Sequence, residues 1–144
     1  MTDRFFEAAS EIAASPDAVW AALVDGGGWS SWDSGVDSVD GRIAPGETIT
    51  IRSKVAPGRA FPVKVTVFDA PRQLQFSGGM PLGLFRGVRT YRLTPAGSGT
   101  RFEMREAYTG PLLGMMWRSM PDLGPSFRQF AAGLKARVEG AAHS

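Results

Sequence analysis

The chain has 144 residues, of which 43% are hydrophobic and 21% charged, and it carries a formal net charge of +2 at pH 7. It has no cysteine, which excludes disulfides, thiolate nucleophiles, iron–sulfur clusters and cysteine zinc sites, and its single histidine, His143, is next to last, so we expect no Ser-His-Asp triad and no metal site. We expect one domain over residues 1–144, since a chain near this length buries about 70% of its unfolded surface around one core. We also expect no cofactor.

The first predicted elements are a strand and a capped helix. Residues 6–12 alternate as a strand with one buried face does. Ser15 and Pro16 then mark a helix start, because a serine side chain caps free N–H groups and proline suits the first helical position. The apolar side of this helix and the glycines that end it are Val19, Trp20, Leu23 and Gly26–Gly28. Trp29 and Trp32 follow in a short second helix, either as packing anchors or at the rim of a cavity.

The pattern Ile-x-Ala-Ser-Pro-x-x-Val-Trp at residues 12–20 resembles the polyketide cyclase/dehydrase and lipid-transport family. This family lies within the START-like (SRPBCC) superfamily that includes the major birch pollen allergen. The strand-rich middle and the closing run FRQFAAGLKARVEG extend the resemblance over nearly the whole chain. The resemblance implies an α+β helix-grip fold with two short helices after the first strand. In that fold a curved antiparallel sheet of about six to seven strands wraps a long C-terminal helix and leaves an apolar cavity.

The middle of the chain, residues 36–109, alternates apolar and polar residues, with glycine and proline at the pauses, as antiparallel strands do. Residues 47–54 and 61–68 each predict a strand with one wet face. Their expected inward side chains are Ile49, Ile51, Ser53, Val63, Val65 and Val67. The next strand has Leu74, Phe76 and Gly78 in its apolar phase. The glycine-rich residues 77–87 lack a phosphate-loop motif, so we interpret them as a bend or a mobile loop.

The last two strands, predicted at residues 84–94 and 100–109, form a hairpin around Pro95–Gly99. This turn pairs Leu93 with Phe102, Tyr91 with Met104, Arg89 with Glu106 and Gly87 with Tyr108. Most of these side chains are apolar, so we predict that the set faces the interior and carries an Arg89–Glu106 pair with it. A slip of one residue would turn both charges outward to water.

Arg89 and Glu106 are therefore the candidate catalytic or binding residues. The guanidinium suits a carboxylate, phenolate or carbonyl oxygen, and the carboxylate suits a ligand hydroxyl or the role of a base. A purely structural pair that closes the inner face is an equal alternative. The full set of candidate ligand-binding residues is Arg89, Glu106, Tyr91, Tyr108, Phe76, Phe85, Met104, Met116, Met120 and Trp32.

A helical period begins near Pro111 and continues to the end of the chain. Its apolar face is Phe127, Phe130, Leu134 and Val138. Pro121 and the pair Gly124–Pro125 predict a kink or break before that face. Methionine is flexible, so the following residues either line an adaptable pocket or fill the core: Met80, Met104, Met115, Met116 and Met120.

Three functions remain open from the sequence. The first, which we favour, is a protein that binds or carries a small hydrophobic molecule. The second is a cyclase or dehydratase-type enzyme acting on a polyketide-like substrate, in which Arg89 stabilises an enolate and Glu106 or a tyrosine moves the proton. The third, a regulator that recognises a protein through an exposed apolar patch, ranks last because no exposed apolar run is evident.

Charge and hydropathy also limit location and partners. The 16 basic residues are scattered rather than grouped beside aromatic residues, which argues against nucleic acid. No apolar run is long enough to span a membrane, and the opening residues lack the apolar core of a secretory signal. We therefore expect a cytoplasmic protein, monomeric or homodimeric, whose partner is a small hydrophobic molecule.

Overall fold

The computed structural model describes residues 4–142, so His143 lies outside the described residues. One antiparallel sheet of seven strands forms the body, in the order β1-β7-β6-β5-β4-β3-β2. The strands are β1 (Arg4–Ile12), β2 (Val36–Asp40), β3 (Thr48–Ser53), β4 (Phe61–Asp69), β5 (Gln73–Gly79), β6 (Arg86–Ala96) and β7 (Gly99–Thr109). The helices are α1 (Pro16–Val24), η1 (Gly26–Ser31), η2 (Pro81–Gly83), α2 (Leu113–Ser119) and α3 (Gly124–Ala142).

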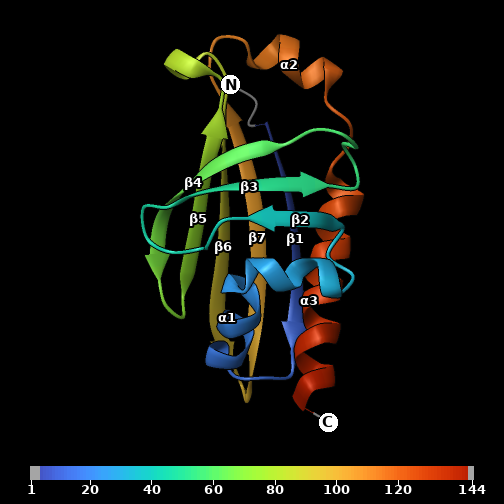
Figure 1. Cartoon of the computed structure of the whole chain (residues 1–144). Coiled ribbons are helices and arrows are strands. Elements are labelled where there is room, and N and C mark those ends of the chain that lie inside the picture. The colour runs from blue at the N-terminus through green and yellow to red at the C-terminus, as the bar shows by residue number, and fades with distance from the viewer. Residues whose placement is uncertain (1–3, 143–144) are drawn as a thin grey trace.

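The sheet is strongly curled. Figure 1 shows β2 and β3 running crosswise to β6 and β7, while α3 lies along the side left open by the sheet. Antiparallel sheets twist, and accumulated twist bends a long sheet into a partial barrel that a helix can fill. The predicted curved sheet around a C-terminal helix is confirmed. Among residues 4–142, no helix is long and apolar enough to cross a membrane.

The N-terminal helix begins where the sequence predicts it. The Ser15 hydroxyl accepts a hydrogen bond from the Ala18 amide at 3.2 Å. The three glycines after α1 do more than end it, because they form the first turn of η1. A side chain at Gly26 would lie 2.9 Å from the Ile43 side chain, so the glycine lets η1 pack closely on the loop after β2.

Both tryptophans of this region anchor packing. Trp29 is fully buried, and its ring nitrogen donates a hydrogen bond to the Leu23 carbonyl at 3.1 Å. Its ring lies 4.9 Å from that of Phe130 on α3, and the ring of Trp32 lies 5.2 Å from the same phenylalanine. These contacts hold η1 against α3, so the packing alternative holds for the two tryptophans.

Strand β4 departs from the predicted alternation. Its pairing with β5 shifts register between Val65 and Val67, as a β-bulge does. The shift brings Phe68 to the core side, where its ring lies 5.2 Å from that of Trp20. The prediction that Val67 faces inward with Val63 and Val65 is therefore wrong at Val67, because the bulge adds one residue to the period of two.

The hairpin of β6 and β7 has the predicted register, including Arg89 opposite Glu106. Its strands extend closer to the turn than predicted, and Ala96 pairs with Gly99. Pro95 is tolerated inside β6 because β5 pairs with β6 only as far as Arg92, which leaves a free edge beyond it.

The C-terminal segment breaks as predicted. Helix α2 ends at Ser119, and α3 starts at Gly124. The predicted apolar face of α3 is buried: Phe127, Phe130, Leu134 and Val138. Gly133 allows α3 to approach the loop before β2, since a side chain there would collide with the Asp33 carbonyl oxygen.

Candidate functional site

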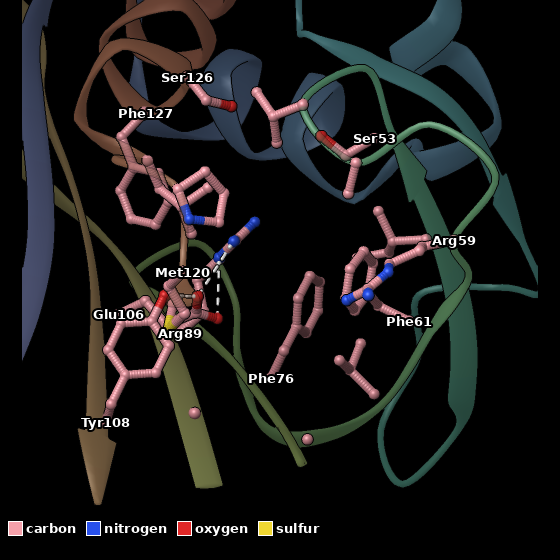
Figure 2. A pocket seen from close by; sticks show the side chains of 18 of the residues that line it. Ser53, Arg59, Phe61, Phe76, Arg89, Glu106, Tyr108, Met120, Ser126 and Phe127 are labelled. Carbon is pink, nitrogen blue, oxygen red and sulfur yellow. Dashed lines mark hydrogen bonds and ion pairs between the residues drawn. The ribbon is translucent and has the colours of Figure 1, made fainter. Parts of the chain in front are cut away.

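A cavity of about 430 Å³ lies between the inner face of the sheet and α3. Its volume falls in the range of about 300–1,000 Å³ that is typical of small-molecule sites. The wall is built mostly from apolar side chains of the sheet, α2 and α3, with Phe76, Phe127 and Met120 among them (Figure 2). The predicted apolar cavity is thus present.

Small residues on the inner face leave room for this cavity. Ser53, Gly78 and Gly87 all line it at positions where larger side chains would project inward. A side chain at Gly87 would lie 3.2 Å from the Tyr108 ring and 3.6 Å from the Glu106 carboxyl carbon. The glycine therefore both opens the cavity and lets Tyr108 lie flat against β6.

One polar cluster faces this apolar space. The Arg89 Nη2 donates a hydrogen bond to Glu106 Oε2 at 3.3 Å, and Arg89 Nε lies 3.3 Å from Glu106 Oε1. The Tyr108 hydroxyl donates a short hydrogen bond to the same Oε2. The guanidinium carbon lies 4.8 Å from the centre of the Phe127 ring on α3, a cation–π contact. Figure 2 shows the guanidinium directed into the cavity.

The pair is sheltered from bulk solvent. The side chains of Arg89 and Glu106 expose 21% and 17% of their surface, and both line the cavity. Burial alone lowers the pKa of Arg89, but the charge of Glu106, with smaller contributions from Tyr91 and Tyr108, outweighs it and raises that pKa. Arg89 is therefore a permanent cation at this site.

The two tyrosines are held in the protonated form. Burial raises the pKa of Tyr108, and the charge of Glu106 and the hydrogen bond to it raise it further, against a smaller opposing effect of Arg89. Burial also raises the pKa of Tyr91, with Arg89 acting in the opposite direction. A protonated phenol donates hydrogen bonds, so Tyr108 acts as a donor to Glu106 rather than as a base.

Eight of the ten predicted site residues line the cavity, and two do not. Those in the lining are Phe76, Phe85, Arg89, Met104, Glu106, Tyr108, Met116 and Met120. Tyr91 is fully buried behind Phe76, with ring centroids 5.5 Å apart, and Trp32 packs on Phe130. Within residues 4–142, the Tyr91 hydroxyl has no hydrogen-bond partner. Tyr91 and Trp32, which we expected to contact a ligand, therefore do not line this cavity.

Two of the methionines also lie elsewhere. Met80 and Met115 are exposed and do not line this cavity, whereas Met104, Met116 and Met120 do. Met115 lies one residue before Met116 on α2, so the two point to different sides of a short helix. Periodicity over seven helical residues is too short to tell these sides apart.

Sequence reasoning missed the lining residues that come from loops and from the start of α3. Val55 and Arg59 enter the wall from the segment between β3 and β4, and Ser126 enters it from α3; Figure 2 shows Arg59 and Ser126. A loop has no period, so alternation carries no signal for Arg59. Within residues 4–142, no group of three or more His, Cys, Asp or Glu side chains could hold a metal ion.

A curled antiparallel sheet closed by a long C-terminal helix over an internal cavity defines a helix-grip fold. Residues 5–139 match the model of the family described as polyketide cyclase / dehydrase and lipid transport. The chain belongs to this family, as the N-terminal pattern and the closing helix predict. A comparison with curated proteins found no match.

Solved structures share the fold at low sequence identity. TTHA0849 from Thermus thermophilus is 23% identical, with a TM-score of 0.71 over 96% of this chain and 99% of that one. Ara h 8.0201 is 18% identical, with a TM-score of 0.64 over 99% of each chain. The di-domain ARO/CYC StfQ from the steffimycin biosynthetic pathway is 14% identical, with a TM-score of 0.74 over 97% of this chain and 52% of that one. These likenesses show the helix-grip fold.

Proposed function

We propose that this protein binds or carries a small hydrophobic molecule in the cavity between the sheet and α3. Family and fold together support ligand binding or cyclase activity in general. The observation that carries the proposal is the cavity itself, a mostly apolar space of about 430 Å³ with the Arg89–Glu106–Tyr108 cluster on one wall. Apolar pockets with a few convergent polar groups are the usual form of small-molecule sites.

The cavity walls and the polar cluster have separate roles. Phe76, Phe127 and Phe130 offer aromatic surface that stabilises an apolar ligand by removing it from water. Arg89 uses Nη2 for Glu106 and retains further N–H groups toward the cavity, which suit a ligand carbonyl or hydroxyl oxygen. The walls thus supply affinity, of about 8 kcal/mol for micromolar binding, and the cluster supplies orientation.

Binding of the neutral fluorescent probe N-phenyl-1-naphthylamine tests this proposal. Gly87→Val places a branched side chain beside Tyr108 and takes up part of the cavity, so we expect it to weaken probe binding by about tenfold, which corresponds to about 1.4 kcal/mol. Ala9→Val, at an exposed position of β1, is the matched control and should bind as the unaltered protein does. Equal binding by all three proteins would place the probe outside the cavity and refute the proposal.

The natural ligand is sought without a prior guess. Native mass spectrometry of freshly purified protein, followed by organic extraction, identifies any small molecule that the protein retains. A retained apolar compound absent from Gly87→Val would support the cavity site directly. Retention that is equal in both proteins would contradict it.

A second candidate is a cyclase or dehydratase-type enzyme working in the same cavity. It is favoured by the placement of Arg89, Glu106 and Tyr108 together on the cavity wall. Arg89 would stabilise an enolate oxygen and Glu106 would take up the proton. Both carboxylate oxygens of Glu106 already face partners, so the base would first have to give up a contact. Glu106→Gln that retains binding of the extracted compound but loses its turnover would favour the enzyme over the carrier.

A further inference from the structure

The cavity reaches the molecular surface beside the segment between β3 and β4. Four residues of its lining are exposed there: Val55, Arg59, Phe61 and Pro62. Val55 and Phe61 each expose 42% of their surface, which is high for large apolar side chains. Figure 2 shows Arg59 and Phe61 across the cavity from Arg89 and Glu106. This group, which we call the mouth, places one guanidinium among exposed apolar surface.

The charges of the lining do not balance. Its ionised side chains are Arg59, Arg89 and Glu106. Arg89 and Glu106 are paired with each other, and Tyr108 donates to Glu106. Among the ion pairs and side-chain hydrogen bonds within residues 4–142, none includes the Arg59 guanidinium. The lining therefore has one cation left over, and it lies at the mouth.

From this we infer that the ligand is an amphipathic monoanion, whose apolar body fills the cavity and whose carboxylate or similar single-charged acid binds Arg59 at the mouth. The inference rests on the proposed binding function and adds the ligand's charge and orientation to it. A guanidinium offers a planar fork of donors that matches a carboxylate or sulfonate. One unpaired cation balances one negative charge, whereas a doubly charged phosphate monoester would keep an excess charge.

The opposite orientation is disfavoured by the polar cluster. An acid placed at the deep wall would lie beside the carboxylate of Glu106, and it would compete with that carboxylate for Arg89. Two like charges close together in a sheltered site repel each other strongly. A neutral oxygen of the ligand suits the Arg89 end, and the acid suits the Arg59 end.

Two naphthyl probes that differ in one acidic group test the inference. N-phenyl-1-naphthylamine is neutral, and 8-anilino-1-naphthalenesulfonate carries a single sulfonate on a similar body. Fluorescence titration measures Kd for both probes with the unaltered protein, Arg59→Gln and Arg42→Gln. Arg42 is exposed and does not line the cavity, so its variant matches the loss of one surface charge.

We expect Arg59→Gln to raise Kd for the sulfonate probe by about three- to tenfold, the range for a charged hydrogen bond at a partly exposed site. Its Kd for the neutral probe should stay within about twofold of the value for the unaltered protein. Arg42→Gln should leave Kd unchanged for both probes. The selective effect should shrink as salt is raised, because salt screens exposed charges.

The possible failures differ from one another. If Arg59→Gln changes Kd by the same factor for both probes, or changes Kd for neither, while the neutral probe still binds, the inference is overturned and cavity binding stands. If the neutral and the anionic probe both fail to bind the unaltered protein, cavity binding fails and the inference falls with it.

Discussion

Replacing Arg89 and Glu106, singly and together, tests whether they are an energetically coupled pair. Glu106→Gln keeps an acceptor for the Tyr108 hydroxyl but leaves the Arg89 cation without its counter-charge. Arg89→Met keeps much of the side-chain volume but leaves the carboxylate with Tyr108 alone. The double variant removes both charges and keeps most of the volume of both side chains.

The magnitude follows from burial. Removing one partner of a fully buried pair costs about 3–5 kcal/mol, whereas an exposed pair contributes about 0–1 kcal/mol. Arg89 and Glu106 expose 21% and 17% of their side chains, mostly toward a cavity, so they lie nearer the buried limit. We expect each single variant to lose about 2–3 kcal/mol and the double variant to lose about 1–2 kcal/mol. The sum of the single losses then exceeds the double loss by about 3 kcal/mol.

Urea unfolding with linear extrapolation measures these free energies. The matched control is the same cycle at Lys54 and Asp37, whose charged atoms are closer, at 2.8 Å, but whose side chains are exposed. We expect a coupling below about 1 kcal/mol there. If the Arg89–Glu106 losses add to within about 0.5 kcal/mol, the two charges do not depend on each other and the description of the polar cluster as a sheltered pair is wrong.

Two further predictions concern the aromatic residues. The chain has two tyrosines, Tyr91 and Tyr108, and burial raises the pKa of each above the ordinary 10.0. The folded state thus favours their protonated forms, so the free energy of unfolding should fall as pH rises above about 10. Ultraviolet absorbance should show tyrosinate near that pH only in the urea-unfolded chain, and its appearance near pH 10 in the folded protein would contradict this. Phe130→Ala should cost about 3–5 kcal/mol in urea unfolding, because the ring packs against both Trp29 and Trp32 in the core; a loss under about 1 kcal/mol would mean that η1 is held to α3 by other contacts.

The part of the site that sequence could predict depends on one short turn. Gly97 and Ser98 leave little freedom for the hairpin, so the register follows from counting residues and brings Arg89 opposite Glu106. Alternation then places both on the face shared with Met104 and Tyr108. The fold could be predicted from the sequence because its signals are also local: the capping serine before α1 and the apolar period of α3 each mark an element that tertiary packing then reinforces.

The part that sequence could not predict depends on curvature and on loops. A bulge in β4 moves Phe68 to the core in place of Val67, and no local pattern marks it. Tyr91 shares the inner phase with Arg89, yet it lies two residues further along β6, where Phe130 fills the space under the sheet. Which inward residues border a cavity, and which border α3, is decided by how far the sheet has curled away from the helix.

The cavity also constrains the state of the protein without a ligand. An unfilled cavity destabilises a fold by about 24 cal/mol per Å³, so a dry space of about 430 Å³ would cost about 10 kcal/mol. That approaches the whole stability of a typical domain, about 5–15 kcal/mol. The exposed mouth beside Arg59 and the polar atoms of the Arg89–Glu106 cluster offer water both a way in and hydrogen-bond partners, so we expect the cavity to be hydrated when no ligand is bound. A ligand that binds in the cavity should then displace water from its apolar walls, and the free energy of unfolding should rise with the logarithm of the ligand concentration once that concentration exceeds Kd.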